Sequence, residues 1–134
     1  MRLLPALCGP LLAAVFLLAA CDTGPEVCED GELATEDLRL GVGDTARASS
    51  TVNINFVGRL GSPTGEIFGD GDDVTFDLDE AIAGFRQGMV GMREGGERRI
   101  TVPPNLGYGN VELPAIPACS TLIFDVELIE VDPD

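Results

Sequence analysis

Four segments of the chain alternate apolar with polar residues, and this pattern constrains the fold more than any other feature. In the first, Val52, Ile54 and Phe56 alternate with a threonine and two asparagines. A period of two places one set of side chains on one face of a strand, as in antiparallel sheets that bury one face and expose the other. A turn cluster at 61–65 follows the first segment. The four segments are 51–56, 74–78, 99–102 and 122–128. A fifth, shorter alternation at 38–42 predicts one more strand.

One further segment has the apolar spacing of a helix. Ile82, Phe85 and Met89 fall on one helical face, and Asp79 is expected to cap its start. Two glycines inside the segment lower its intrinsic helicity, so the helix needs packing against the sheet. We therefore predict an α+β fold, in which an antiparallel, curled β-sheet wraps around one short helix.

The beginning of the chain is predicted to be an export signal. Arg2 supplies a short positive region, and an apolar run at 11–18 follows it. The sequence Leu18-Ala19-Ala20-Cys21 resembles the bacterial lipoprotein box, in which the cysteine is lipidated and the chain is cut just before it. The alternative is an uncleaved anchor helix over 3–20. Either interpretation places the rest of the chain outside the cytoplasm.

These features divide the chain into three predicted parts. Residues 1–20 form the lipoprotein signal peptide, residues 21–36 the lipidated cysteine and an acidic tether, and residues 37–134 the folded domain. The predicted location is the cell envelope, lipid-anchored to a membrane and extracytoplasmic, which is the periplasm in a Gram-negative organism. With a formal net charge of -15, the domain is expected to meet the membrane only through its N-terminal lipid.

The cysteines fit an oxidising compartment. Cys8 would leave with the signal and Cys21 would carry the lipid, so Cys28 and Cys119 remain. We predict that these two form a disulfide, and two separate thiols are the alternative. They lie too far apart in the sequence to form a CxxC redox motif.

The composition excludes several kinds of chemistry. The chain has no histidine, and all eight of its basic residues are arginines. Histidine bases, nucleophiles paired with histidine and lysine Schiff bases are therefore absent, as are most zinc sites. The acidic charge excludes nucleic acid as a partner. The acidic run at 70–73 lacks the spacing of an EF-hand and is interpreted as a solvated turn, so no metal or cofactor is predicted.

Four motifs, in order and at the expected spacing, resemble the FKBP-type peptidyl-prolyl cis-trans isomerases. They are AIAGFRQGMVGM at 81–92, GGERRITVPP at 95–104, LGYG at 106–109 and STLIFDVEL at 120–128. The resemblance extends from about residue 38 to residue 131, nearly the whole predicted domain. It implies the FKBP-like fold and peptidyl-prolyl isomerase activity, here in a bacterial lipoprotein form.

The resemblance also implies which residues form the family's proline-binding pocket. Tyr108, Ile82 and Phe85 take the catalytic positions. The Tyr108 hydroxyl and the Ile82 N–H would contact the substrate, and Phe85 would form the pocket floor. Six further residues are implied in substrate binding: Phe56, Phe68, Ala81, Ile116, Phe124 and Asp70.

Two departures from the family pattern leave an alternative open. Gly69 stands where the family usually has an aspartate. Asp70, the next residue, is the candidate substitute, and the alternative is that the pocket lacks this polar anchor. The loop at 109–116 is shorter than in many members. These departures favour, as the alternative, a non-catalytic peptide-binding or chaperone module, and a purely structural lipoprotein is a weaker third interpretation.

The predicted function is isomerisation of X-Pro bonds in exported proteins. Rotation about the bond breaks amide resonance but forms no covalent bond, so the reaction needs no nucleophile, metal or cofactor. A dry apolar pocket can bind the proline ring and remove water from the carbonyl, which favours the twisted amide over the planar one. The expected partners are proline-containing polypeptides, and the protein is expected to be a monomer.

Overall fold

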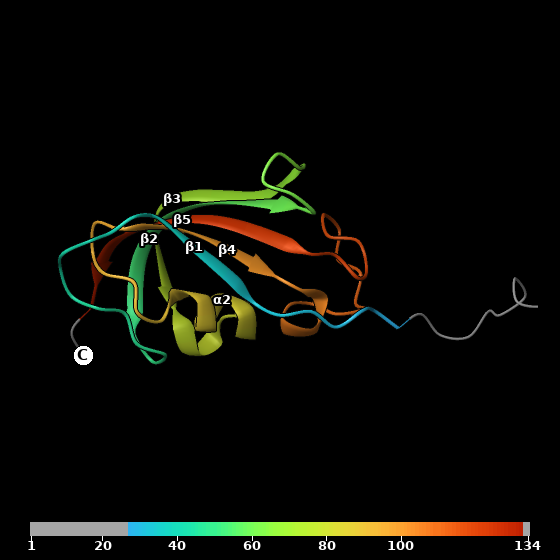
Figure 1. The fold of residues 1–134 in the computed structure, drawn as a ribbon, viewed down its shortest axis with the longest axis horizontal. Helices are drawn as coiled ribbons and strands as arrows, with labels where there is room; N and C mark the ends of the chain where they lie inside the picture. Colours follow the sequence, from blue (N-terminus) through green and yellow to red (C-terminus); the bar gives the residue numbers. More distant parts are fainter. Residues whose placement is uncertain (1–26, 133–134) are drawn as a thin grey trace, which may run out of the picture.

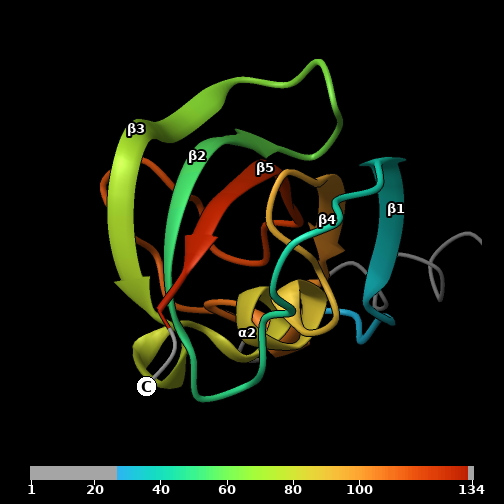
Figure 2. The same cartoon turned by 90° about the vertical axis from the view of Figure 1, so that its left-hand side faces the viewer.

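Five antiparallel strands form one curved sheet in the computed structural model, which describes residues 27–132. The predicted signal peptide and Cys21 lie outside the described residues. The strands are β1 (Ala34–Arg39), β2 (Thr51–Leu60), β3 (Ile67–Asp77), β4 (Glu97–Val102) and β5 (Leu122–Val131). Their order in the sheet is β1-β4-β5-β2-β3, and Figure 1 and Figure 2 show them curling around one helix. The predicted α+β fold is thereby confirmed.

The core lies between the concave face of the sheet and the helix α2 (Ala83–Met89). Val52 and Ile54 of β2 are buried there, as the alternation predicts. Two glycines allow α2 to approach β4 closely. A Cβ on Gly88 would lie 2.5 Å from Cγ2 of Ile100, and one on Gly84 would meet Val102. The residues that weaken this helix in isolation therefore permit the packing that stabilises it.

The segment before α2 differs from the prediction. A 3-10 turn, η1 (Leu78–Glu80), comes first, and its cap is Asp77, whose Oδ1 accepts a hydrogen bond from the Asp79 N–H at 3.0 Å. The expectation that Asp79 caps the helix is therefore wrong. Leu78 is fully buried, and its N–H donates to the Ser50 carbonyl at 3.0 Å, which fixes the turn against the core. Two extended residues follow before α2 begins.

The first strand also differs from the prediction. The alternation at 38–42 predicts a strand there, but β1 occupies Ala34–Arg39 and every one of its residues is exposed. Ion pairs across to β4 hold it: Arg98 Nε lies 2.7 Å from Asp37 Oδ1, and Arg39 Nη1 lies 2.6 Å from Glu97 Oε1. Because backbone pairing with β4 and these ion pairs, rather than burial, hold this edge strand, apolar alternation did not reveal it. The predicted boundary between residues 36 and 37 falls inside β1.

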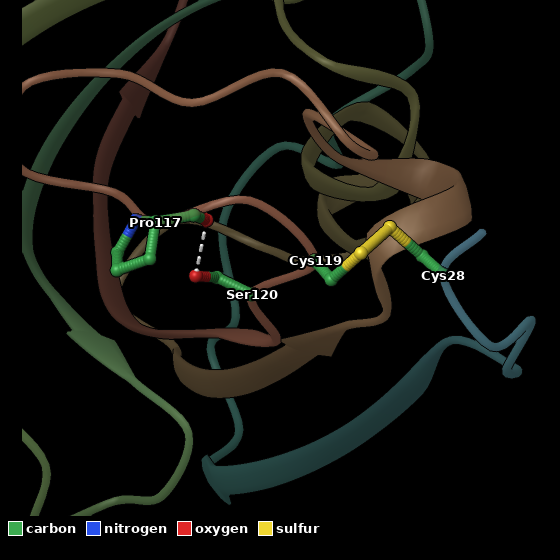
Figure 3. Close-up of a disulfide and its surroundings, with 4 residues drawn as sticks. All are labelled: Cys28, Pro117, Cys119 and Ser120. Atoms are coloured by element: carbon green, nitrogen blue, oxygen red, sulfur yellow. Dashed lines mark hydrogen bonds between the residues drawn. A yellow bond between two sulfur atoms is a disulfide. The ribbon is translucent and has the colours of Figure 1, made fainter. Parts of the chain in front are cut away.

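A disulfide joins Cys28 to Cys119, with their Cα atoms 5.1 Å apart (Figure 3). Cys119 lies in a turn in which the Ser120 hydroxyl donates to the Pro117 carbonyl at 2.6 Å. Nearby, the Gly31 N–H donates to Asn105 Oδ1 at 2.9 Å. From Cys28 onward, the segment predicted as a tether is therefore attached to the domain.

Residues 27–132 contain neither a membrane-spanning helix nor a metal-binding cluster. No helix in that range is long and apolar enough to cross a membrane. In the same range, no three histidine, cysteine, aspartate or glutamate side chains converge as a metal ion would require.

Candidate functional site

An aromatic cavity of about 280 Å³ opens between the sheet and the segment that leads into α2. Five of its lining residues come from the sheet, from α2 and from the loop after the 3-10 turn η2 (Pro104–Leu106). The other three are the last residue of η1 and the two residues that join η1 to α2. Most are apolar or aromatic, which suits the burial of a small hydrophobic ring. The lining residues are Phe56, Phe76, Glu80, Ala81, Ile82, Phe85, Tyr108 and Phe124.

Three aromatic contacts fix the walls and floor of the cavity. The Phe85 ring, on α2, lies with its centroid 5.0 Å from that of Phe124 in an edge-to-face arrangement. It also lies 5.8 Å from the centroid of Phe76, which in turn lies 5.9 Å from that of Phe56. Phe85 is only 5% exposed. These rings hold one another in place, so the cavity is largely formed before a ligand enters.

Tyr108 lies at the mouth of the cavity with a side chain that is free to meet a ligand. It is 38% exposed. Its loop is held by the backbone, because the N–H groups of Gly107 and Gly109 both donate to the Pro104 carbonyl, at 3.0 and 2.9 Å. Gly109 has a φ of 61°, which a glycine adopts without strain. The loop is thus rigid, while the hydroxyl can act as a donor.

Ile82 offers a second donor to the same cavity. It precedes α2 in an extended conformation, and its carbonyl accepts the first helical hydrogen bond, from the Arg86 N–H at 3.0 Å. None of the hydrogen bonds found among residues 27–132 uses the Ile82 N–H as its donor. This N–H can therefore bind a ligand carbonyl.

Other hollows on the domain lack this character. One of about 520 Å³ is lined by residues such as Asp44, Arg47 and Arg93, and by no aromatic side chain. It offers little apolar surface against which a proline ring could be buried. The aromatic cavity is therefore the site that fits the predicted chemistry.

The comparisons with known proteins agree with this geometry. A sequence model described as FKBP-type peptidyl-prolyl cis-trans isomerase matches residues 43–129. The chain belongs to this family. FK506-binding protein 4 of Aspergillus fumigatus is 46% identical over 101 residues, which cover 72% of this chain and 20% of that protein. FkpA of Escherichia coli is 36% identical over 103 residues, which cover 75% of this chain and 38% of FkpA. The chain thus spans well under half the length of these curated relatives.

Crystal structures of other proteins show the same fold. The crystal structure of a peptidyl-prolyl cis-trans isomerase from Pseudomonas syringae pv. tomato superposes with a TM-score of 0.69 at 30% identity. That superposition covers 91% of this chain and 92% of the other. The crystal structure of Escherichia coli FkpA gives a TM-score of 0.70, also at 30% identity, and the match covers 92% of this chain and 59% of FkpA.

Six of the nine FKBP pocket residues named from the sequence line the cavity. Tyr108, Ile82, Phe85, Phe56, Ala81 and Phe124 are brought together. The sequence reasoning did not assign Phe76 and Glu80 to the cavity, although both line it. Phe76 lies in the alternating segment at 74–78, a pattern that predicts only a strand with one buried face. The turn η1 brings it beside Phe85, and no local pattern in the sequence indicates that approach.

The other three FKBP pocket residues lie outside the cavity lining. The Phe68 ring packs edge-to-face on Phe124, with centroids 5.5 Å apart, so it supports the wall from behind. Ile116 is buried as part of the hydrophobic core, and its backbone pairs with that of Leu113. Asp70 is exposed on β3 opposite Val57, so it does not replace the family's aspartate within the cavity.

Proposed function

We propose that this protein catalyses cis-trans isomerisation of X-Pro bonds in its aromatic cavity. The observation that carries the proposal is that Tyr108 and Ile82 both line one hollow with Phe85, and that the Tyr108 hydroxyl and the Ile82 N–H have no hydrogen-bond partner among residues 27–132. A proline ring fits the apolar floor, and a donor can hold the carbonyl of the rotating bond.

The proposed mechanism needs only binding energy and the removal of water. The uncatalysed rotation faces a barrier of about 18–20 kcal/mol, because the planar amide is stabilised by resonance. Water stabilises that polar planar form, so an apolar cavity removes part of its advantage. Each 1.36 kcal/mol by which the twisted amide is favoured over the planar one gives about a tenfold acceleration.

The direct test is a proline-isomerisation assay on the purified protein with its disulfide intact. We expect acceleration of cis-trans exchange in a peptide with one X-Pro bond. Tyr108→Phe removes the hydroxyl and keeps the ring, so we expect kcat/KM to fall about two- to thirteenfold, as the loss of one neutral hydrogen bond implies. A folded protein that gives no acceleration above background refutes the proposal.

A second candidate function is peptide binding without useful catalysis. It is favoured by one observation: Asp70 lies away from the cavity and Gly69 carries no side chain, so neither residue supplies the carboxylate that the family usually has after the phenylalanine at position 68. This candidate predicts micromolar to millimolar peptide binding, little rate gain and no effect of Tyr108→Phe on the rate. The assay described above therefore separates the two functions.

We also propose that the protein is exported and anchored by a lipid on Cys21, and that its substrates are exported proteins. The lipobox-like sequence supports the anchor, and the Cys28–Cys119 disulfide is typical of proteins outside the cytoplasm. The test is the mass and membrane partition of the protein as expressed in a bacterial host. Cys21→Ser should abolish a diacylglycerol-sized mass addition and release the protein from membranes. An unmodified Cys21 in a membrane-bound protein would instead support the anchor-helix alternative.

A further inference from the structure

Glu80 is the one carboxylate among the described residues that line the aromatic cavity. It lies at the end of η1, directly before Ala81 and Ile82, and it is exposed. A side chain in this place is next to the N–H proposed to bind the substrate backbone. It is therefore positioned to meet a residue that flanks the bound proline.

The Glu80 carboxylate has no protein partner among residues 27–132. None of the side-chain hydrogen bonds or ion pairs in that range involves it. Three other carboxylates are engaged: Asp37 pairs with Arg98, Asp125 pairs with Arg99, and Asp77 caps η1. Glu80 thus keeps its full capacity to accept a charge-assisted hydrogen bond from a ligand.

The surroundings of Glu80 are also acidic. Asp77 and Asp79 lie in the same turn, and the lining of the cavity contains no arginine. The nearest basic residue along the chain is Arg86 of α2, which forms no ion pair with Glu80. The whole chain carries a formal net charge of -15. Such a field attracts cationic peptides and repels acidic ones.

We propose that Glu80 makes this cavity select prolines flanked by lysine or arginine. The inference rests on the proposed function, since it names the substrate class of the same site. A contact at a solvent-exposed rim is worth little, so we expect a two- to fivefold preference for a cationic over a neutral flanking residue at low ionic strength. The preference should shrink as salt screens the charges.

The test compares peptides of equal length that differ only in the residue beside proline: lysine, glutamine or glutamate, placed before or after it. For the wild-type protein we expect kcat/KM to decrease in that order, mainly through KM. Glu80→Gln should bring the lysine-to-glutamine ratio close to one, and Glu80→Lys should invert it. Glu36→Gln, an equal charge change on the exposed edge strand β1, should leave the ratio as in the wild type.

The result that overturns the inference is a wild-type protein that turns over the three peptides equally, or a Glu80→Gln variant that keeps the wild-type ratio. Calorimetric Kd values for the same peptides test the same ratio without turnover. If no peptide is isomerised but the lysine peptide binds more tightly, the proposed catalysis fails and the selectivity of Glu80 stands. If peptides are isomerised without charge preference, the selectivity alone fails.

Discussion

Removal of the Cys28–Cys119 disulfide should cost this domain a large part of its stability. The two residues are 91 positions apart, so the bond closes almost the whole described domain into a loop. The chain-entropy relation gives about 4.5 kcal/mol at 25 °C for a loop of this length, through restriction of the unfolded state. A domain of this size has a total stability of about 5–15 kcal/mol, so the loss is a third of it or more.

The backbone at Cys119 offers a matched pair of variants. Cys119 has a φ of 60°, in the left-handed region that costs a non-glycine residue about 1–2 kcal/mol. We therefore expect Cys28→Ser with Cys119→Ser to lose about 4.5 kcal/mol, and Cys28→Ser with Cys119→Gly to lose about 1 kcal/mol less. The first pair removes only the bond, whereas the second also relieves the conformational strain.

The assay is urea unfolding followed by circular dichroism. With a slope of about 1.5 kcal/mol per molar urea, the serine pair should lower the midpoint by about 3 M. Reduction of the wild-type protein should reproduce this value and serves as the control. Because the Cys119 N–H donates to the Gly109 carbonyl at 2.8 Å, its amide should also lose protection from hydrogen exchange. A loss below about 1.5 kcal/mol for the serine pair refutes the entropic reasoning, and equal stabilities of the two pairs refute the strain at Cys119.

Three other perturbations probe the packing and the charge of the domain. Gly88→Ala places a Cβ 2.5 Å from Ile100 Cγ2, so overpacking should lower the unfolding free energy by about 1–3 kcal/mol, despite the higher helix propensity of alanine. Phe85→Leu keeps the floor apolar but loses the ring contacts, and it should cost about 1–2 kcal/mol of stability and raise the KM for peptides. The hydrogen bond from Arg99 to Asp125 raises the pKa of the arginine, so this stabilisation is present throughout the neutral range and is lost as pH rises through that raised pKa. Since the chain has no histidine and the mechanism transfers no proton, kcat/KM should stay flat from pH 6 to pH 8, and a bell-shaped profile would contradict the mechanism.

The sequence was sufficient for the elements whose signal is local. Val52 and Ile54 have the period of a half-buried strand, and the turn cluster at 61–65 joins β2 to β3 as expected. Ile82, Phe85 and Met89 identified the segment of the one α-helix in the described range. The start of that helix was wrong by several residues, because a buried Leu78 fixes a 3-10 turn where propensity alone favours a helical cap.

The candidate site was predicted in part. The family motifs indicate which residues lie near the cavity, but not which of their side chains face it. Phe68 and Asp70 occupy β3 beside a register shift in its pairing with β2, and the structure directs one behind Phe124 and the other to solvent. Glu80 and Phe76 join the cavity because η1 bends the chain between them. None of these placements has a signal in the local sequence.

From the sequence we could predict the class of fold, the segment of the helix that the sheet encloses and the apolar character of the site. These features depend on the spacing of apolar residues that are near one another in the chain. The number and positions of the cysteines also predicted the Cys28–Cys119 disulfide, which is confirmed. The tertiary structure was needed to bring Asp37 and Arg39 of β1 into ion pairs with β4. It also decided which carboxylate borders the cavity. These outcomes depend on contacts between segments that are distant in the chain, and such contacts exist only once the sheet has curled around α2.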